Sequence, residues 1–157
     1  MPIHGSKRTR IGYIGILAAV LLWCGLIVGA PWLQDKSPPA AVLIRLFFAP
    51  VCHQEANRSF HVSDKPFAVC ARCTGIYAGF LAGVLIFPAL RKKSRDAPFR
   101  RVFLLAAVPT AAEFGLAKFD LIPDCAVIRA LTGFVIGAVV ATCVMSELFE
   151  ILKASKP

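Results

Sequence analysis

The chain has 157 residues and a formal net charge of +9, and 57% of its residues are apolar, with a mean hydropathy of +0.69. Soluble domains contain roughly 45–50% apolar residues, so the excess apolar surface is expected to face lipid. The charge does not indicate nucleic-acid binding, because the basic residues cluster at 7–10 and 91–101, beside long apolar runs. Such clusters mark the cytoplasmic side of membrane proteins. We therefore predict an all-α, polytopic membrane helical bundle whose partner is the lipid bilayer.

Residues 11–33 form the first predicted transmembrane helix. This run of 23 uncharged residues makes a helix of roughly 34 Å, which is long enough for a bilayer core. A cleaved signal peptide is the alternative, with Val28-Gly29-Ala30 as the cleavage site. We expect the helix to be retained, because the run is longer than a usual signal-peptide apolar region and Pro31 would follow the cut directly.

The next apolar segment, residues 40–49, is too short to cross a bilayer and carries Arg45. We predict a short interfacial helix there. A second transmembrane helix is predicted at 66–90, with Arg72 near its start.

Two further spans are predicted, at 102–118 and at 126–149. Small residues recur every four positions in the second span (Gly75, Gly79, Gly83) and in the fourth (Gly133, Gly137, Ala141). Such a repeat places small side chains on one helix face and lets another helix approach closely. The second and fourth spans are therefore predicted to be neighbours. The four spans and the interfacial helix make a single transmembrane domain over residues 11–150.

The distribution of Lys and Arg predicts the orientation in the cell membrane. The basic N-terminus at 1–10, the loop at 91–101 and the tail at 151–157 together hold 11 of the 18 basic residues. The positive-inside rule then places both termini in the cytoplasm. The segment 34–65 and the turn at 118–124 are expected to face outward.

Four of the six cysteines are expected near that outward face: Cys52, the Cys70-x-x-Cys73 pair and Cys125. Cys24 and Cys143 fall inside apolar spans and are interpreted as packing residues. At a helix start, a spacing of three puts both sulfurs of the pair on one face, within reach of one metal ion or of each other. The helix N-terminus and Arg72 favour their thiolate form.

A metal site is the leading interpretation. Cys52, His53, Cys70 and Cys73 supply three sulfurs and one nitrogen, an acceptable tetrahedral set for zinc. Adjacent residues need not both turn inward, so His61 is an alternative nitrogen donor. Whether such a site is structural or catalytic, and so whether the protein is an enzyme, is left open by the sequence.

A redox role is the first alternative. Outward-facing compartments of bacteria are often oxidising, and thiol pairs there become disulfides. A four-helix membrane protein with outward cysteines also resembles the quinone-linked disulfide-forming enzymes. The C-x-x-C at 70–73 would then belong to a membrane thiol–disulfide oxidoreductase. A structural disulfide and free thiols are the remaining readings.

Charged residues inside the spans give a third class of function. Glu113 lies around the middle of the third span, and a charge at that depth is costly and usually paired. Arg129 is its most economical partner. The pair is either a structural ion pair or part of a polar cavity in a small transporter or lipid-binding protein. That cavity would be lined by Arg58, Arg72, Tyr77, Glu113 and Arg129.

Several of these motifs resemble one known family. Cys52-His53-Gln54, then Arg58-Ser59-Phe60 and the stretch Val69–Gly79 are similar to a domain of unknown function numbered 2085, found in small prokaryotic multi-pass membrane proteins. The resemblance covers roughly residues 45–140. It implies that these eight residues form one constellation: Cys52, His53, Arg58, Cys70, Arg72, Cys73, Tyr77 and Arg129.

The chain departs from the family pattern at two places. Glu113-Phe114 stands where members often carry Asp-Gly, and Cys125 replaces part of a Ser/Asn-rich approach to the arginine. Cys125 therefore looks peculiar to this sequence, which argues against a mechanism that requires it.

Overall fold

The computed structural model describes residues 7–94, 99–119 and 125–154, and helices dominate them. The helices are α1 (Lys7–Lys36), α2 (Pro38–Phe48), α3 (Ala71–Ser94), α4 (Phe99–Lys118) and α5 (Ala126–Ala154). A 3₁₀ turn, η1 (Ala56–Arg58), and a hairpin of β1 (His61–Val62) and β2 (Lys65–Pro66) lie between α2 and α3. The all-α prediction is confirmed. Residues 1–6, 120–124 and 155–157 of the predicted termini and outward turn lie outside the described residues.

Three helices contain segments that are long and apolar enough to cross a bilayer, namely α1, α3 and α5. α4 holds the third predicted span at 102–118, but it carries Glu113 and charged ends and is not among these three. The membrane character follows from α1, α3 and α5, and the crossing by α4 stays a prediction. Residues 66–70 precede α3, so the second helix begins later than the sequence indicated.

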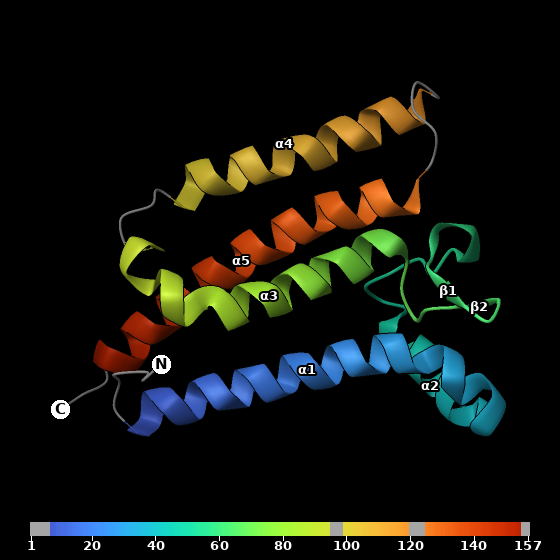
Figure 1. Cartoon of the computed structure of the whole chain (residues 1–157), viewed down its shortest axis with the longest axis horizontal. Coiled ribbons are helices and arrows are strands. Elements are labelled where there is room, and N and C mark those ends of the chain that lie inside the picture. The colour runs from blue at the N-terminus through green and yellow to red at the C-terminus, as the bar shows by residue number, and fades with distance from the viewer. Residues whose placement is uncertain (1–6, 95–98, 120–124, 155–157) are drawn as a thin grey trace.

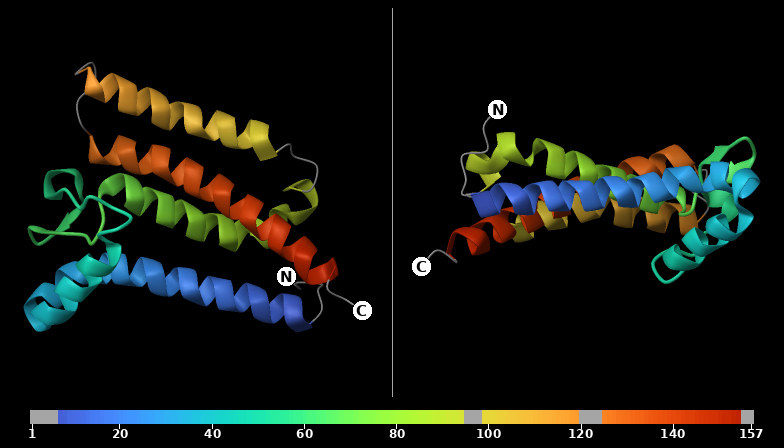
Figure 2. Two further views of the ribbon diagram at one scale, coloured as in Figure 1. Left: turned by 180° about the vertical axis from the view of Figure 1, so that it is seen from behind. Right: turned by 90° about the horizontal axis from the view of Figure 1, so that it is seen from below.

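The four long helices lie side by side in the order α1, α3, α5, α4 (Figure 1). Seen from below, they occupy a thin layer (Figure 2). α1 begins and α5 ends at the same end of the bundle. The hairpin, the start of α3 and the start of α5 lie at the opposite end. This second end, which holds Cys52, Cys70 and Cys73, is called the hairpin end below.

Glycines let α3 and α5 approach closely along the centre of the bundle. A Cβ atom added at Gly79 would lie 2.0 Å from the carbonyl oxygen of Phe134, and one at Gly137 would lie 2.0 Å from that of Ile76. Real atoms do not approach so closely, so the two backbones are in contact where side chains would stand. The predicted pairing of the second and fourth spans is confirmed.

α2 turns away from the axis of α1 at a corner (Figures 1 and 2). The Ser37 N–H donates to the Leu33 carbonyl at 2.8 Å, and Pro38 and Pro39 open α2. Proline suits the first turn of a helix, where its missing N–H would have no helical partner. With 11 residues, α2 is a short helix, as expected for the interfacial segment.

Two hydrophobic clusters join α1 to the bundle. At the end where α1 begins, the Tyr13 hydroxyl donates to the Val84 carbonyl at 3.1 Å, and Tyr13 packs near Phe149. At the hairpin end, Ile27 and Phe48 pack with Cys52 and Val69. The cysteine site packs against the apolar side chains of this second cluster.

Candidate metal centre

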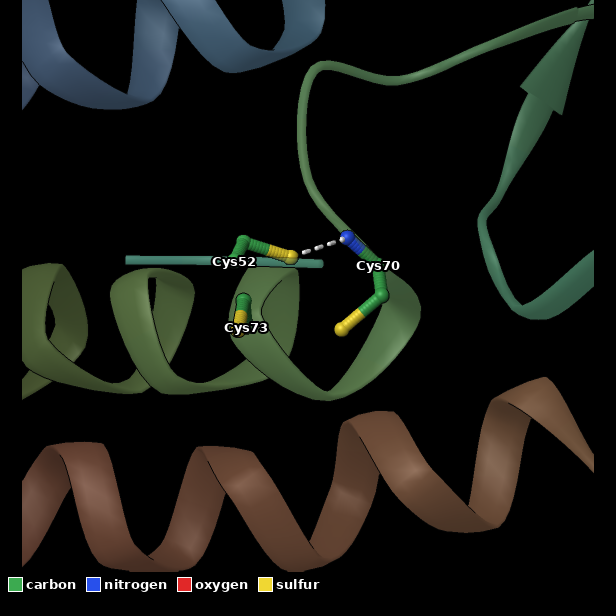
Figure 3. Close-up of side chains that lie close together, drawn as sticks. All are labelled: Cys52, Cys70 and Cys73. Carbon is green, nitrogen blue, oxygen red and sulfur yellow. Dashed lines mark hydrogen bonds between the residues drawn. The ribbon is translucent and has the colours of Figure 1, made fainter. Parts of the chain in front are cut away.

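Three cysteines converge at the hairpin end. The Sγ atoms of Cys52, Cys70 and Cys73 all lie within 4.8 Å of one another. Cys52 follows α2, Cys70 directly precedes α3, and Cys73 lies in the first turn of that helix (Figure 3). Within residues 7–94, 99–119 and 125–154, this is the one group of three or more cysteine, histidine or carboxylate side chains close enough to share a metal ion.

Backbone hydrogen bonds fix the Cys52 sulfur. It accepts the N–H of Cys70 at 3.2 Å and the N–H of Gln54 at 3.4 Å. Gln54 itself has a φ of 54°, in the left-handed region that non-glycine residues rarely adopt, so the chain turns sharply directly after this hydrogen bond. The Gln54 side chain in turn donates to the Arg45 carbonyl at 2.7 Å. Gln54 therefore orients the loop that presents Cys52.

The hairpin carries Cys70 to the same place. Ser63 and Asp64 form its two-residue turn with φ values of 50° and 62°, as a tight hairpin turn of the I′ type requires. Arg45 of α2 donates to the Pro66 carbonyl at 2.9 Å, and the Ala68 N–H donates to the Ile27 carbonyl of α1 at 3.4 Å. The segment before α3 is thus tied to both preceding helices.

The environment favours a thiolate at Cys70. The Cys73 thiol donates a hydrogen bond to the Cys70 sulfur and, against the opposing effect of burial, this bond lowers the pKa of Cys70 to about 5. Hydrogen bonding with Cys52 acts in the same direction. Cys70 also stands at the N-terminus of α3, where the helix dipole stabilises negative charge. The hydrogen bonds and the helix N-terminus therefore both favour the anionic form of Cys70.

Aromatic side chains line the cluster on the side of α1 and α2. The ring centroid of Trp23 lies 5.0 Å from that of Phe48 and 5.6 Å from that of Tyr77. Tyr77, one turn beyond Cys73, packs in the same hydrophobic cluster as the three cysteines. The sequence did not indicate Trp23 or Phe48 as neighbours of the site, because residues far apart in the chain meet here.

The Arg72 side chain leaves the same turn of α3 in another direction and reaches α4. The Glu113 carboxylate, 6% exposed, pairs with the Arg72 guanidinium, and its other oxygen lies 3.5 Å from Nε of Arg129. The predicted Glu113–Arg129 pair is confirmed, and Arg72 joins it. This ion triad ties α4 to α3 and α5.

The remaining predicted residues lie outside both groups. His53 and His61 are exposed and are not part of the three-cysteine group. Arg58 pairs at 2.9 Å with Glu55, and both side chains are exposed. Cys125 lies at the same end of the molecule, directly before α5, but also outside the group. The constellation implied by the family resemblance is thus split into a sulfur cluster, an ion triad and surface residues.

Comparison with known proteins agrees with the resemblance found in the sequence. A family model described as "Predicted membrane protein (DUF2085)" matches residues 52–143, from the first cysteine of the site to the middle of α5. Uncharacterized protein MJ1492 of Methanocaldococcus jannaschii is 30% identical over 113 residues, which cover 71% of this chain and 72% of that protein. No solved structure matches the chain.

Proposed function

The chain belongs to the DUF2085 family of predicted membrane proteins, and we propose that it holds a metal ion, zinc, between Cys52, Cys70 and Cys73. The convergence of the three sulfurs, within 4.8 Å of one another, carries the proposal. Zinc–sulfur bonds of about 2.3 Å in tetrahedral geometry separate the sulfurs by about 3.8 Å. Small side-chain rotations would bring the three sulfurs to that spacing.

The chemistry of the donors also fits zinc. Thiolate is the form that binds metal, and the pKa of Cys70 is already lowered to about 5. Sulfur ligands select soft or borderline ions such as zinc over magnesium or calcium. The backbone N–H groups of Gln54 and Cys70, bonded to the Cys52 sulfur, would stabilise its negative charge when metal is bound.

Elemental analysis of the detergent-purified full chain, combined with a thiol count, tests this proposal. We expect about one zinc per chain, and loss of most of it in each of Cys52→Ser, Cys70→Ser and Cys73→Ser. The matched control is Cys125→Ser, at the same end of the molecule but outside the group. A triple serine variant that keeps its full metal content would refute the metal proposal.

We further propose that both termini are cytoplasmic and that the cysteine cluster lies at the outward membrane face. The start of α1 and the end of α5 lie together, as an even number of crossings requires (Figure 1). The end of α3 lies at that same end, and the adjoining loop is rich in basic residues. A membrane-impermeant thiol reagent on intact cells should label Ser63→Cys but not Ser94→Cys. The reverse labelling would move the site to the reducing side of the membrane.

A membrane thiol–disulfide oxidoreductase is the second candidate. One observation favours it: a low-pKa thiolate at Cys70 lies beside Cys73, with the Cys52 sulfur also close. A nucleophilic thiolate with a neighbouring thiol is the arrangement needed for disulfide exchange. A metal-free protein with a Cys70–Cys73 disulfide, rather than zinc with three reduced thiols, would favour this candidate.

The transporter or lipid-binding alternative receives less support. The Glu113 carboxylate is engaged by both Arg72 and Arg129, which come from different helices. An ion triad bonded in this way stabilises the packing of α4 against α3 and α5, which is the structural one of the two roles that the sequence left open for the pair.

A further inference from the structure

The three-cysteine cluster provides three of the four ligands that zinc prefers. Structural zinc sites have four protein ligands, whereas sites that exchange a ligand have three. His53 and His61 are exposed and lie outside the group, and Cys125 lies outside it as well. Among the residues that the structure describes, no histidine, carboxylate or further cysteine joins the three sulfurs.

We propose that the metal site is open: its fourth position takes a small, neutral, exchangeable donor, with the Tyr77 hydroxyl beside it. This inference rests on the proposed function, because it needs a metal on the three sulfurs. The inference goes beyond the proposed function because it assigns the metal site to ligand binding instead of purely structural support. It also gives Tyr77 a role as a positioning residue.

The charge of the site argues for a neutral donor. Three thiolates and one divalent ion carry a net charge of −1. A fourth, anionic ligand would raise this to −2 in surroundings formed by Ile27, Phe48 and Val69, all of which are buried. Burying an additional unpaired charge against apolar side chains is costly, whereas a neutral nitrogen or oxygen donor adds none.

Tyr77 is the polar side chain best placed to contact that donor. It lies four residues after Cys73 on α3, so both side chains share one helix face. It packs in the same cluster as the three cysteines. Contacts with Trp23 and Phe48 hold its ring. A tyrosine hydroxyl both donates and accepts hydrogen bonds, so it can serve either an N–H or an O–H ligand.

Cobalt(II) can replace zinc as a coloured probe of the site. The detergent-purified full chain, loaded with Co²⁺, would be titrated with imidazole as the neutral donor and azide as the anionic one. We expect imidazole to shift the visible cobalt bands saturably while the thiolate-to-cobalt charge-transfer band persists. That band shows that the metal has not been stripped from the sulfurs. Azide should bind at least about tenfold more weakly than imidazole.

Tyr77→Phe tests the positioning role, because it removes the hydroxyl and keeps the ring. Imidazole affinity should fall roughly 2- to 10-fold, as expected for one lost hydrogen bond. The cobalt content and the thermal unfolding temperature should not change. An unchanged imidazole affinity would remove Tyr77 from the proposal, and equal binding of azide would overturn the charge argument.

The outcomes separate this inference from the proposed function. If Co²⁺ binds through the thiolates but neither ligand alters its spectrum, the site is closed by a fourth protein ligand. The open site is then refuted while the metal proposal stands. If Co²⁺ produces no thiolate charge-transfer band at all, the metal proposal itself fails.

Discussion

The first turn of α3 presents two chemically different faces. Cys70 and Cys73 turn toward Cys52 and the aromatic side chains of α1 and α2, whereas Arg72, between them in sequence, turns toward Glu113 of α4. Residues one or two positions apart on a helix do not share a face, whereas residues three apart do. One short motif therefore supplies both the sulfur cluster and the ion triad.

The two faces differ in how their polar groups are used. The Glu113 carboxylate, 6% exposed, pairs with arginines of α3 and α5, so the charges of the ion triad are used to join helices of the bundle. The sulfurs are held by backbone N–H groups and by each other, and thiolates so arranged can still bind a metal ion or exchange a disulfide. The face with Arg72 is thus suited to holding helices together. The face with the cysteines is suited to binding a metal ion or exchanging a disulfide.

Removing the carboxylate of the ion triad should have the largest effect. Glu113→Ala leaves the Arg72 and Arg129 guanidiniums without that partner inside the bundle, and breaking a buried ion pair from one side costs about 3–5 kcal/mol. Denaturant or thermal unfolding in detergent measures this loss. The matched control is Glu147→Ala, an exposed acid on α5. If both variants unfold alike, the ion triad contributes nothing to stability. The claim that this face of the turn holds the helices together would then be wrong.

The sequence predicted the seam and the charge pair more completely than the surroundings of the cysteines. A four-residue repeat of small residues favours close contact with another helix, and a carboxylate inside an apolar span needs a basic partner. The α3–α5 contact and the Glu113–Arg129 pair could therefore be predicted. The positions of His53 and Arg58 depend on an irregular loop with a left-handed residue at Gln54, which no periodicity encodes. The contact of Trp23 with the site depends on how α1 packs against α3, and local sequence patterns do not predict that packing either.

Filling the seam between α3 and α5 should produce the next largest effect. A Cβ atom at Gly79 would lie 2.0 Å from the Phe134 carbonyl oxygen, so Gly79→Leu forces the two backbones apart. Overpacking of this kind costs roughly 1–3 kcal/mol. Gly25→Leu on α1 is the control, since a Cβ there meets nothing within 4 Å. Equal stability of the two variants in detergent unfolding would mean that α3 does not touch α5 at that point.

The seam between α3 and α5 should support the ion triad more than the sulfur cluster. Movement of α3 away from α5 should disturb the ion triad directly, because Arg72 and Arg129 lie on these two helices. The sulfur cluster contacts α1 and the loop after α2 instead. Gly79→Leu should therefore lose stability while retaining most of its bound metal.

The pH dependence of thiol alkylation tests the sulfur face. Because the pKa of Cys70 is lowered to about 5, its thiolate should persist as pH falls from neutral, and reactivity should disappear only below that value. Iodoacetamide labelling of metal-free protein, located by peptide mass mapping, measures this. Cys73→Ala removes the donor hydrogen bond and should raise the midpoint toward that of an ordinary thiol. An ordinary midpoint in the unsubstituted protein would remove the electrostatic asymmetry between Cys70 and its neighbours.

The smallest effect is expected from His53→Ala, and it decides how many protein ligands the metal has. The sequence favours His53 as the fourth ligand, but the side chain is exposed, and its neighbour Cys52 points into the cluster. The N–H of Gln54, the residue after His53, donates to the Cys52 sulfur, which holds the loop with Cys52 buried and His53 exposed. We therefore expect His53→Ala to retain its zinc, measured by elemental analysis beside Cys52→Ser as the variant that loses it. His61→Ala should behave in the same way. Loss of zinc in either histidine variant would mean that the loop rearranges when metal binds and that the histidine becomes the fourth ligand. The metal would then be held entirely by protein side chains, as the Glu113 carboxylate is held by two arginines.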